Sequence, residues 1–196
     1  MLRSWPAAAA IGLLAVLAGS PSAGAEVRRF RPVAAKSEVS FTASFPLGDF
    51  TGRTQDITGE FRADPADLRS GVAGMLRIKA YGIRTGDDGR DREMYRLLAV
   101  DRHPEIHFTI ERIEASFPST TERADVLLTI TGLMSIRGVE RAMAFPARAR
   151  LRDDKLWVRG EGQLRMSQFG ITPPSRFLFD VKDTLLVSFD VTLAPE

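Results

Sequence analysis

The chain has 196 residues, of which 44% are hydrophobic and 27% are charged, and its formal net charge is +2. A charge this close to zero gives no electrostatic reason to expect a nucleic acid as partner. The chain contains no cysteine, which excludes disulfides, thiolate metal sites and cysteine nucleophiles.

The first 25 residues have the pattern of a secretory signal peptide. Arg3 precedes the apolar run AAAAIGLLAVLAG, which is shorter than the roughly 20 residues that cross a bilayer, and Ala23-Gly24-Ala25 fits the A-x-A cleavage rule. We therefore expect a cleaved signal peptide at 1–25 and a single domain at 26–196. This predicts a periplasmic or secreted protein with no integral membrane segment after cleavage; the alternative is an uncleaved N-terminal anchor.

After this leader, apolar and polar residues alternate with the period of two that is typical of β-strands. Eight such segments follow in chain order, at 37–45, 56–61, 75–82, 105–113, 125–133, 142–151, 156–166 and 184–193. Turn signals such as SIRGVE, RDDK and PPS separate several of them. Long antiparallel strands with one apolar face predict an all-β fold, and we favour an antiparallel β-barrel of about eight strands over a filled sandwich.

The inward face of these strands mixes bulky residues with small ones. The small inward residues, which we expect to leave room for a ligand, are Ala43, Gly59, Ala80, Ala147, Ala149, Gly160 and Gly162. The alternative is that the glycines mark bulges and bends. The bulky inward residues, which we predict to form a hydrophobic ligand-binding lining, are Phe41, Phe45, Phe61, Ile78, Phe108, Ile110, Leu128, Ile130, Leu164, Met166, Val187 and Phe189.

The segment 84–108 interrupts the strand pattern with a short helix. Asp87 or Asp88 can cap its N-terminus, and Asp91 and Glu93 would then lie in its first turn, where the helix dipole favours acids. We expect roughly two turns of helix between two strands.

This helix carries an apolar stripe formed by Met94, Leu97 and Leu98, which is the pattern of a helix lying on a hydrophobic surface. Pro104 ends any helix here. We predict that Met94 and Leu97, together with Phe169, close one end of the barrel.

The two histidines, His103 and His107, do not predict a metal site. Pro104 separates them, and four residues of strand span roughly 13 Å, which one metal ion cannot bridge. Ser167 has no histidine near it in sequence, so no nucleophilic triad is indicated. We predict no catalytic and no metal-binding residues.

Two rows of arginines remain, Arg28, Arg29 and Arg31, and Arg148, Arg150 and Arg152. We interpret them as outer strand faces paired with acids of neighbouring strands. Capture of an anionic head group at a barrel rim is the alternative.

Four stretches, SEVSF, RTGDDGRDREMYRLLAVDRHPEIHF, LTITGLMSIRGVERAMAF and LRMSQFGI, resemble the YceI-like family of polyisoprenoid-binding proteins in sequence and order. The resemblance implies a lipocalin-like barrel that holds a long isoprenoid, a periplasmic or secreted location, and a non-catalytic role in quinone or lipid carriage or in the stress response. It implies no cofactor apart from a bound isoprenoid quinone or polyprenyl lipid. Met166 and Gln168 stand where the family usually has Arg and Asp, so the resemblance implies that this protein recognises the head group differently or not at all.

The favoured hypothesis is a non-catalytic carrier of a polyisoprenoid or another long-chain amphiphile. A lipid-modifying barrel enzyme of the cyclase or isomerase type, and a ligand-free structural or interaction barrel, are the alternatives. The expected partners are a long-chain isoprenoid or fatty ligand and a transiently contacted membrane, and a homodimer is compatible with the sequence.

Overall fold

The computed structural model describes residues 26–116, 125–176 and 179–196. The predicted signal peptide at 1–25 lies outside the described residues, so its cleavage stays a prediction. Within the described part of the chain, no helix has both the length and the apolar character needed to cross a bilayer.

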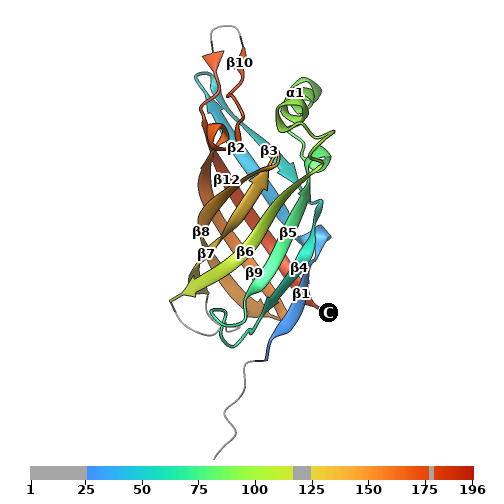
Figure 1. The fold of residues 1–196 in the computed structure, drawn as a ribbon. Helices are drawn as coiled ribbons and strands as arrows, with labels where there is room; N and C mark the ends of the chain where they lie inside the picture. The colour runs from blue at the N-terminus through green and yellow to red at the C-terminus, as the bar shows by residue number, and fades with distance from the viewer. Residues whose placement is uncertain (1–25, 117–124, 177–178) are drawn as a thin grey trace, which may run out of the picture.

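Eight strands form a closed antiparallel barrel, which confirms the predicted fold class (Figure 1). Their order around the barrel is β1-β4-β5-β6-β7-β8-β9-β12, and β12 pairs with β1 to close the ring. The bounds are β1 Arg28–Pro32, β4 Ile57–Ala63, β5 Ala73–Lys79, β6 Glu105–Ala115, β7 Val126–Ile136, β8 Val139–Arg152, β9 Lys155–Arg165 and β12 Thr184–Pro195.

A further hairpin, β2 (Glu38–Phe45) and β3 (Gly48–Thr54), extends the wall beside β12. One edge of β12 pairs with β9. Along its other edge, the N-terminal part pairs with β2 and the last residues pair with β1. The short helix η1 (Ala34–Lys36) connects β1 to β2 at this change of partner. The sequence did not predict β3, whose segment GDFTGRT has few apolar residues.

The remaining elements are η2 (Ala80–Gly82), α1 (Asp88–Leu98), η3 (Met166–Phe169), β10 (Ser175–Arg176) and β11 (Phe179–Asp180). Helix α1 and the hairpins β2–β3 and β10–β11 lie at one end of the barrel, and the chain's C-terminus lies at the other (Figure 1). We call the first of these the α1 end.

Helix α1 begins as predicted, because the side chain of Asp87 caps it by accepting a hydrogen bond of 2.8 Å from the backbone N–H of Arg90. The helix has 11 residues, about three turns rather than two. The acids of its first turn are Asp88 and Asp91. Glu93 lies beyond that turn, contrary to the prediction, and forms an ion pair of 2.5 Å with Arg96.

Two tight turns use residues with positive φ. Arg137 and Gly138 join β7 to β8 with φ of 54° and 75°, and Asp153 and Asp154 join β8 to β9 with φ of 48° and 59°. Two successive residues with positive φ form a two-residue hairpin turn whose twist matches that of the two strands it joins. Gly and Asp adopt positive φ more readily than most residues. The turn signals SIRGVE and RDDK therefore fix two hairpins of the barrel.

Candidate functional site

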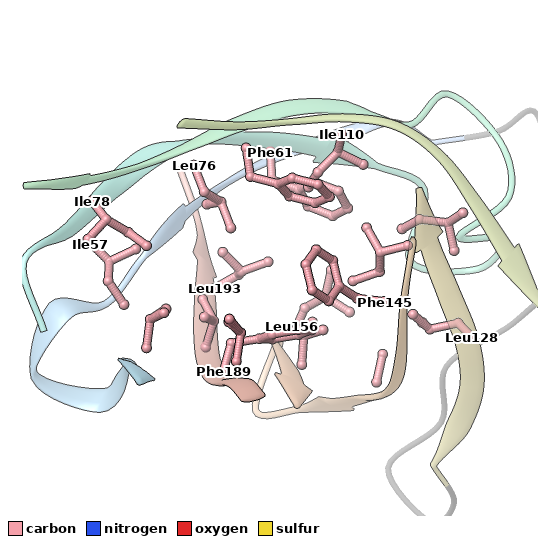
Figure 2. Close-up of a pocket in the computed structure, with 18 of the residues that line it drawn as sticks. Ile57, Phe61, Leu76, Ile78, Ile110, Leu128, Phe145, Leu156, Phe189 and Leu193 are labelled. Carbon is pink, nitrogen blue, oxygen red and sulfur yellow. The ribbon is translucent and has the colours of Figure 1, made fainter. Parts of the chain in front are cut away.

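The barrel encloses a cavity of about 100 Å3. Side chains from opposite walls point into it, with Phe61 on one side and Phe145 on the other (Figure 2). Every described side chain that lines it is apolar. The described lining therefore offers hydrocarbon contacts and no side-chain hydrogen bond or charge.

Eight of the twelve residues predicted for the lining do line this cavity. They are Phe61, Ile78, Phe108, Ile110, Leu128, Ile130, Val187 and Phe189. The alternation of apolar residues located them, because residues two apart on a strand share a face. That they contact a ligand stays a prediction.

The other four predicted residues lie elsewhere. Phe41 and Phe45 each lie 6.3 Å from the ring of Phe50, in an aromatic cluster of the β2–β3 hairpin. Leu164 and Met166 are buried in a separate apolar cluster towards the α1 end. Met166 was assigned to a strand, but β9 ends at Arg165 and Met166 starts the turn η3, which takes it out of the strand alternation.

Three phenylalanines occupy the centre of the barrel. The ring of Phe145 lies 5.5 Å from that of Phe108 and 6.0 Å from that of Phe189, and both pairs meet edge to face. Such pairs contribute about 0.5–1.5 kcal/mol beyond the area that they bury. Phe145 is missing from the predicted lining although it falls on the inward face of the segment 142–151, so the same alternation could have found it.

Of the small inward residues, Ala149 lines the cavity, but the two glycines of β9 do not leave the room that the sequence predicted. A Cβ atom at Gly160 would lie 2.5 Å from the ring of Phe189, and one at Gly162 would lie 2.6 Å from the ring of Phe145. Each glycine therefore accommodates an aromatic ring from a neighbouring strand. This filling explains why the cavity is smaller than a typical ligand pocket of roughly 300–1,000 Å3.

The α1 end is closed by the second apolar cluster. Phe169 is fully buried there, and Leu97 and Leu98 of helix α1 pack against the same cluster. Met94 is half-buried on the same helix but is not one of the residues of this cluster. The opposite end is covered by the β4–β5 connection, whose Leu68 is buried and lines the cavity.

Polar contacts fix helix α1 to the segment before it. The hydroxyl of Tyr95 donates to the carbonyl of Ile83 at 2.7 Å and accepts from the Arg84 guanidinium at 2.6 Å. Burial raises the pKa of Tyr95 above its ordinary value. The buried carboxylate of Asp91 accepts hydrogen bonds from both the backbone N–H and the hydroxyl of Thr85, at 2.8 and 2.7 Å.

The histidines and Ser167 have separate surroundings. His107 lies 3.0 Å from the carboxylate of Glu105, whereas His103 packs beside the turn at Gly138. The hydroxyl of Ser167 donates to Asp183 at 2.5 Å. Among residues 26–116, 125–176 and 179–196, no group of three or more acids and histidines could hold a metal ion.

The arginines of both rows contact acids. In β1, Arg29 and Arg31 are exposed, whereas Arg28 lies on the same face of the strand as the buried Phe30. Arg28, Arg29 and Arg31 pair with Asp154, Glu60 and Glu196. Arg150 lies 2.6 Å from Asp125, which also contacts Arg148 at 4.0 Å. On the other side of β8, however, β9 places Arg159 opposite Arg148 and Lys155 opposite Arg152, so the expected pairing with acids holds on one flank of this row only.

An open groove of about 440 Å3 lies on the outer wall and was not predicted. Its described lining is mainly polar, and it includes Trp157, whose indole N–H donates to Asp190 at 2.6 Å. The strand alternation placed Trp157 on the outer face. The groove itself depends on which strands are neighbours, which the local pattern does not reveal.

Comparison with known proteins gives a family and a fold. The structure is similar to that of Burkholderia cenocepacia BcnA, with a TM-score of 0.68 and 16% identity over 81% of this chain and 97% of that one. It is also similar to a polyisoprenoid binding domain from Saccharophagus degradans, with a TM-score of 0.66 and 14% identity over 85% and 98% of the two chains. A Campylobacter jejuni YCEI protein has a TM-score of 0.58 and 19% identity over 74% and 84%.

At these identities the similarity concerns the fold. No curated protein matches the sequence. The model of the YceI-like domain matches residues 30–193, which includes all eight strands of the closed barrel except the ends of β1 and β12. The chain belongs to the YceI-like family.

Proposed function

We propose that this protein is a non-catalytic carrier that holds the hydrocarbon tail of a polyisoprenoid, such as an isoprenoid quinone or a polyprenyl lipid, inside the barrel. The observation that carries the proposal is the lining of the cavity, which is apolar at every described position. Burial of hydrocarbon there would be favourable by about 25 cal/mol for each Å2 of apolar surface removed from water. The similar domain from Saccharophagus degradans is described as polyisoprenoid binding, which supports the same ligand class.

A lipid-modifying enzyme is less well supported by this interior. Proton transfer or cation chemistry on a bound lipid needs an acid, a base or a nucleophile within reach of the reacting atoms. The described lining offers none of these groups. We therefore assign the barrel to binding.

A barrel that is filled by its own side chains is the second candidate, and the size of the cavity favours it. The volume of about 100 Å3 is below the 150 Å3 or so that accepts benzene in an engineered apolar cavity. A prenyl chain would therefore have to displace side chains, and the central Phe145 is the first of these because it contacts the rings of Phe108 and Phe189.

Mass spectrometry of lipids extracted from the purified protein tests the proposal. The extracted protein is then incubated with a long-chain prenyl quinone, and the increase in melting temperature is measured, because a ligand that binds only the folded state stabilises it. A barrel that holds no lipid when isolated and is not stabilised by the quinone would favour the second candidate.

Ala149→Leu is the control for binding inside the barrel. Ala149 is buried and lines the cavity, so a larger apolar side chain there takes up free volume. The variant should remain folded and lose the stabilisation by the quinone. Equal stabilisation of the variant and the native protein would place the quinone outside the cavity.

The location is part of the proposal. The signal-peptide pattern at 1–25 supports export to the periplasm or the exterior, where a carrier would move a lipid between membranes through water. Fractionation of cells that express the full chain, with N-terminal sequencing of the exported form, tests this. A protein that keeps its leader and stays in the cytoplasmic fraction would overturn the proposed location.

A further inference from the structure

The tip of the β2–β3 hairpin exposes a large apolar side chain. Leu47 lies in the two-residue turn between the paired residues Phe45 and Gly48, and it is 70% exposed. No other large hydrophobic residue in the described part of the chain is exposed to this extent. The hairpin projects beyond the barrel at the α1 end (Figure 1), so this leucine is among the outermost groups there.

An apolar track leads from this tip into the barrel. Strand β2 places Val39, Phe41, Ala43 and Phe45 on one face. Val39 lines the cavity, Ala43 is buried, and the rings of Phe41 and Phe45 meet that of Phe50 on the paired strand β3. Apolar residues therefore occupy one face of β2 from the cavity to Phe45, two residues before the exposed Leu47.

The polar groups around the tip carry charges of both signs. The guanidinium of Arg90, on helix α1, lies over the ring of Phe50 at 5.2 Å. Lys182 is exposed and its backbone N–H bonds to Ser44 of the hairpin at 2.8 Å, while Asp49 is exposed beside the turn. An apolar and aromatic tip beside long cationic side chains resembles the residue set found at the interface of a membrane with water.

We infer that the β2–β3 hairpin docks the protein on a lipid bilayer, with Leu47 inserted among the lipids and the phenylalanines behind it at the interface. A bilayer fits this surface because it accepts an isolated apolar tip without a shaped partner. The mixed charges mean that apolar contact, and not attraction to anionic lipids, provides the affinity. The further role of the apolar track, as the path by which a lipid tail passes between the bilayer and the cavity, rests on the proposed function.

The absence of cysteine from the chain allows the tip to be labelled at one site. Leu47→Cys and the matched Leu127→Cys would each carry a fluorophore that is sensitive to polarity. Leu127 is the control because it is also highly exposed, at 59%, but lies on the outer wall in β7. The probes are phosphatidylcholine vesicles without any prenyl lipid, with and without added phosphatidylglycerol.

The label at position 47 should shift to the emission of an apolar environment and be quenched by brominated lipids, while the label at 127 should do neither. Leu47→Ser should weaken vesicle flotation roughly tenfold, since one buried leucine is worth that factor or more, and Leu127→Ser should leave it unchanged. Binding should change little between low and high salt. Equal signals at 47 and 127, or unchanged flotation of Leu47→Ser, would overturn the inference.

These measurements separate docking from lipid carriage. The vesicles contain no prenyl ligand, so insertion of the tip is detected whether or not the barrel binds isoprenoids. Stabilisation by a prenyl quinone in solution reports on the cavity and should be the same for Leu47→Ser and the native protein. If Leu47→Ser abolished this stabilisation, residue 47 would be part of the ligand site and its assignment to a docking surface would be wrong.

Discussion

The Tyr95 hydroxyl of helix α1 donates a hydrogen bond of 2.7 Å to the backbone carbonyl of Ile83, in the segment between η2 and the helix. This bond and the Arg84 contact attach the middle of the helix to the segment between η2 and the helix. Since Leu97 and Leu98 of the same helix cover the apolar cluster of the α1 end, the hydroxyl also helps to hold that cover in place.

Tyr95→Phe should loosen helix α1. Loss of the hydroxyl leaves the Ile83 carbonyl without this donor, which should cost about 1 kcal/mol of stability. Hydrogen exchange of the amides in Asp88–Leu98 should become faster, and this can be measured by mass spectrometry. Arg96→Gln is the control, because it breaks an exposed ion pair on the same helix that should contribute little. Equal exchange rates in Tyr95→Phe and the native protein would contradict the assigned role.

Phe145→Ala should enlarge the cavity. Removal of a buried phenylalanine typically costs about 3–5 kcal/mol, so the melting temperature should fall. A prenyl quinone should restore more of that loss in the variant than it adds to the native protein, because the tail can occupy the space left by the ring. Calorimetry with and without the quinone measures both effects. A variant that is destabilised but gains nothing from the quinone would favour the barrel filled by its own side chains.

Gly160→Ala should destabilise the barrel more than Gly162→Ala. The new methyl group at 160 would meet the backbone oxygen of Pro146 at 2.5 Å as well as the ring of Phe189, whereas at 162 its three nearest atoms would all belong to the ring of Phe145. A ring can shift, but a backbone in a strand cannot do so without disturbing its hydrogen bonds. We expect a loss of about 1–3 kcal/mol at 160 and a smaller loss at 162, measured by urea denaturation. The reverse order would contradict the packing described for these rings.

Much of this architecture could be predicted from the sequence, because the alternation of apolar residues and the helix-capping pattern match the strands and the helix that form. Alternation over long segments identified most of the barrel strands, and Asp87 marked the start of the helix. The filling of the interior could not be predicted, since it depends on which strands are neighbours. Phe189 faces Gly160 directly across β12 and β9, and nothing near either residue in sequence indicates that pairing.

Strands β1 and β3 were also missed, for a local reason. Strand β1 has five residues, too few to establish a period of two. Strand β3, GDFTGRT, has Phe50 as its one large apolar residue and contains two glycines, which are depleted in strands. The same omission hid the aromatic cluster of the β2–β3 hairpin, and with it the positions of Phe41 and Phe45.

Acid should weaken the contact between Ser167 and Asp183. The Ser167 hydroxyl and backbone N–H donate to the carboxylate at 2.5 and 2.8 Å and hold the pKa of Asp183 below its ordinary value. A pKa that is lower in the folded state adds stability above the unfolded value of about 4, and this stability is lost as the pH falls towards the folded value.

Asp183→Asn should therefore lower the melting temperature at neutral pH. The difference in melting temperature between the variant and the native protein should become smaller below about pH 4. Thermal denaturation over a range of pH checks this. A difference that stays constant with pH would mean that the charge of Asp183 does not matter to this contact.

The pairing of β12 has a consequence for how the chain reaches its native state. This strand pairs with β9, β2 and β1. It therefore joins segments that are far apart in the sequence, and its pairing with β1 closes the barrel. Until it is in place, β1 and β9 have no common neighbour and the apolar interior stays open to water. Contacts of such long range are slow to form. The ring should consequently close only after β12 has been synthesised. Under the proposed export, this delay would leave an interval in which the chain is still open enough to pass through an export channel.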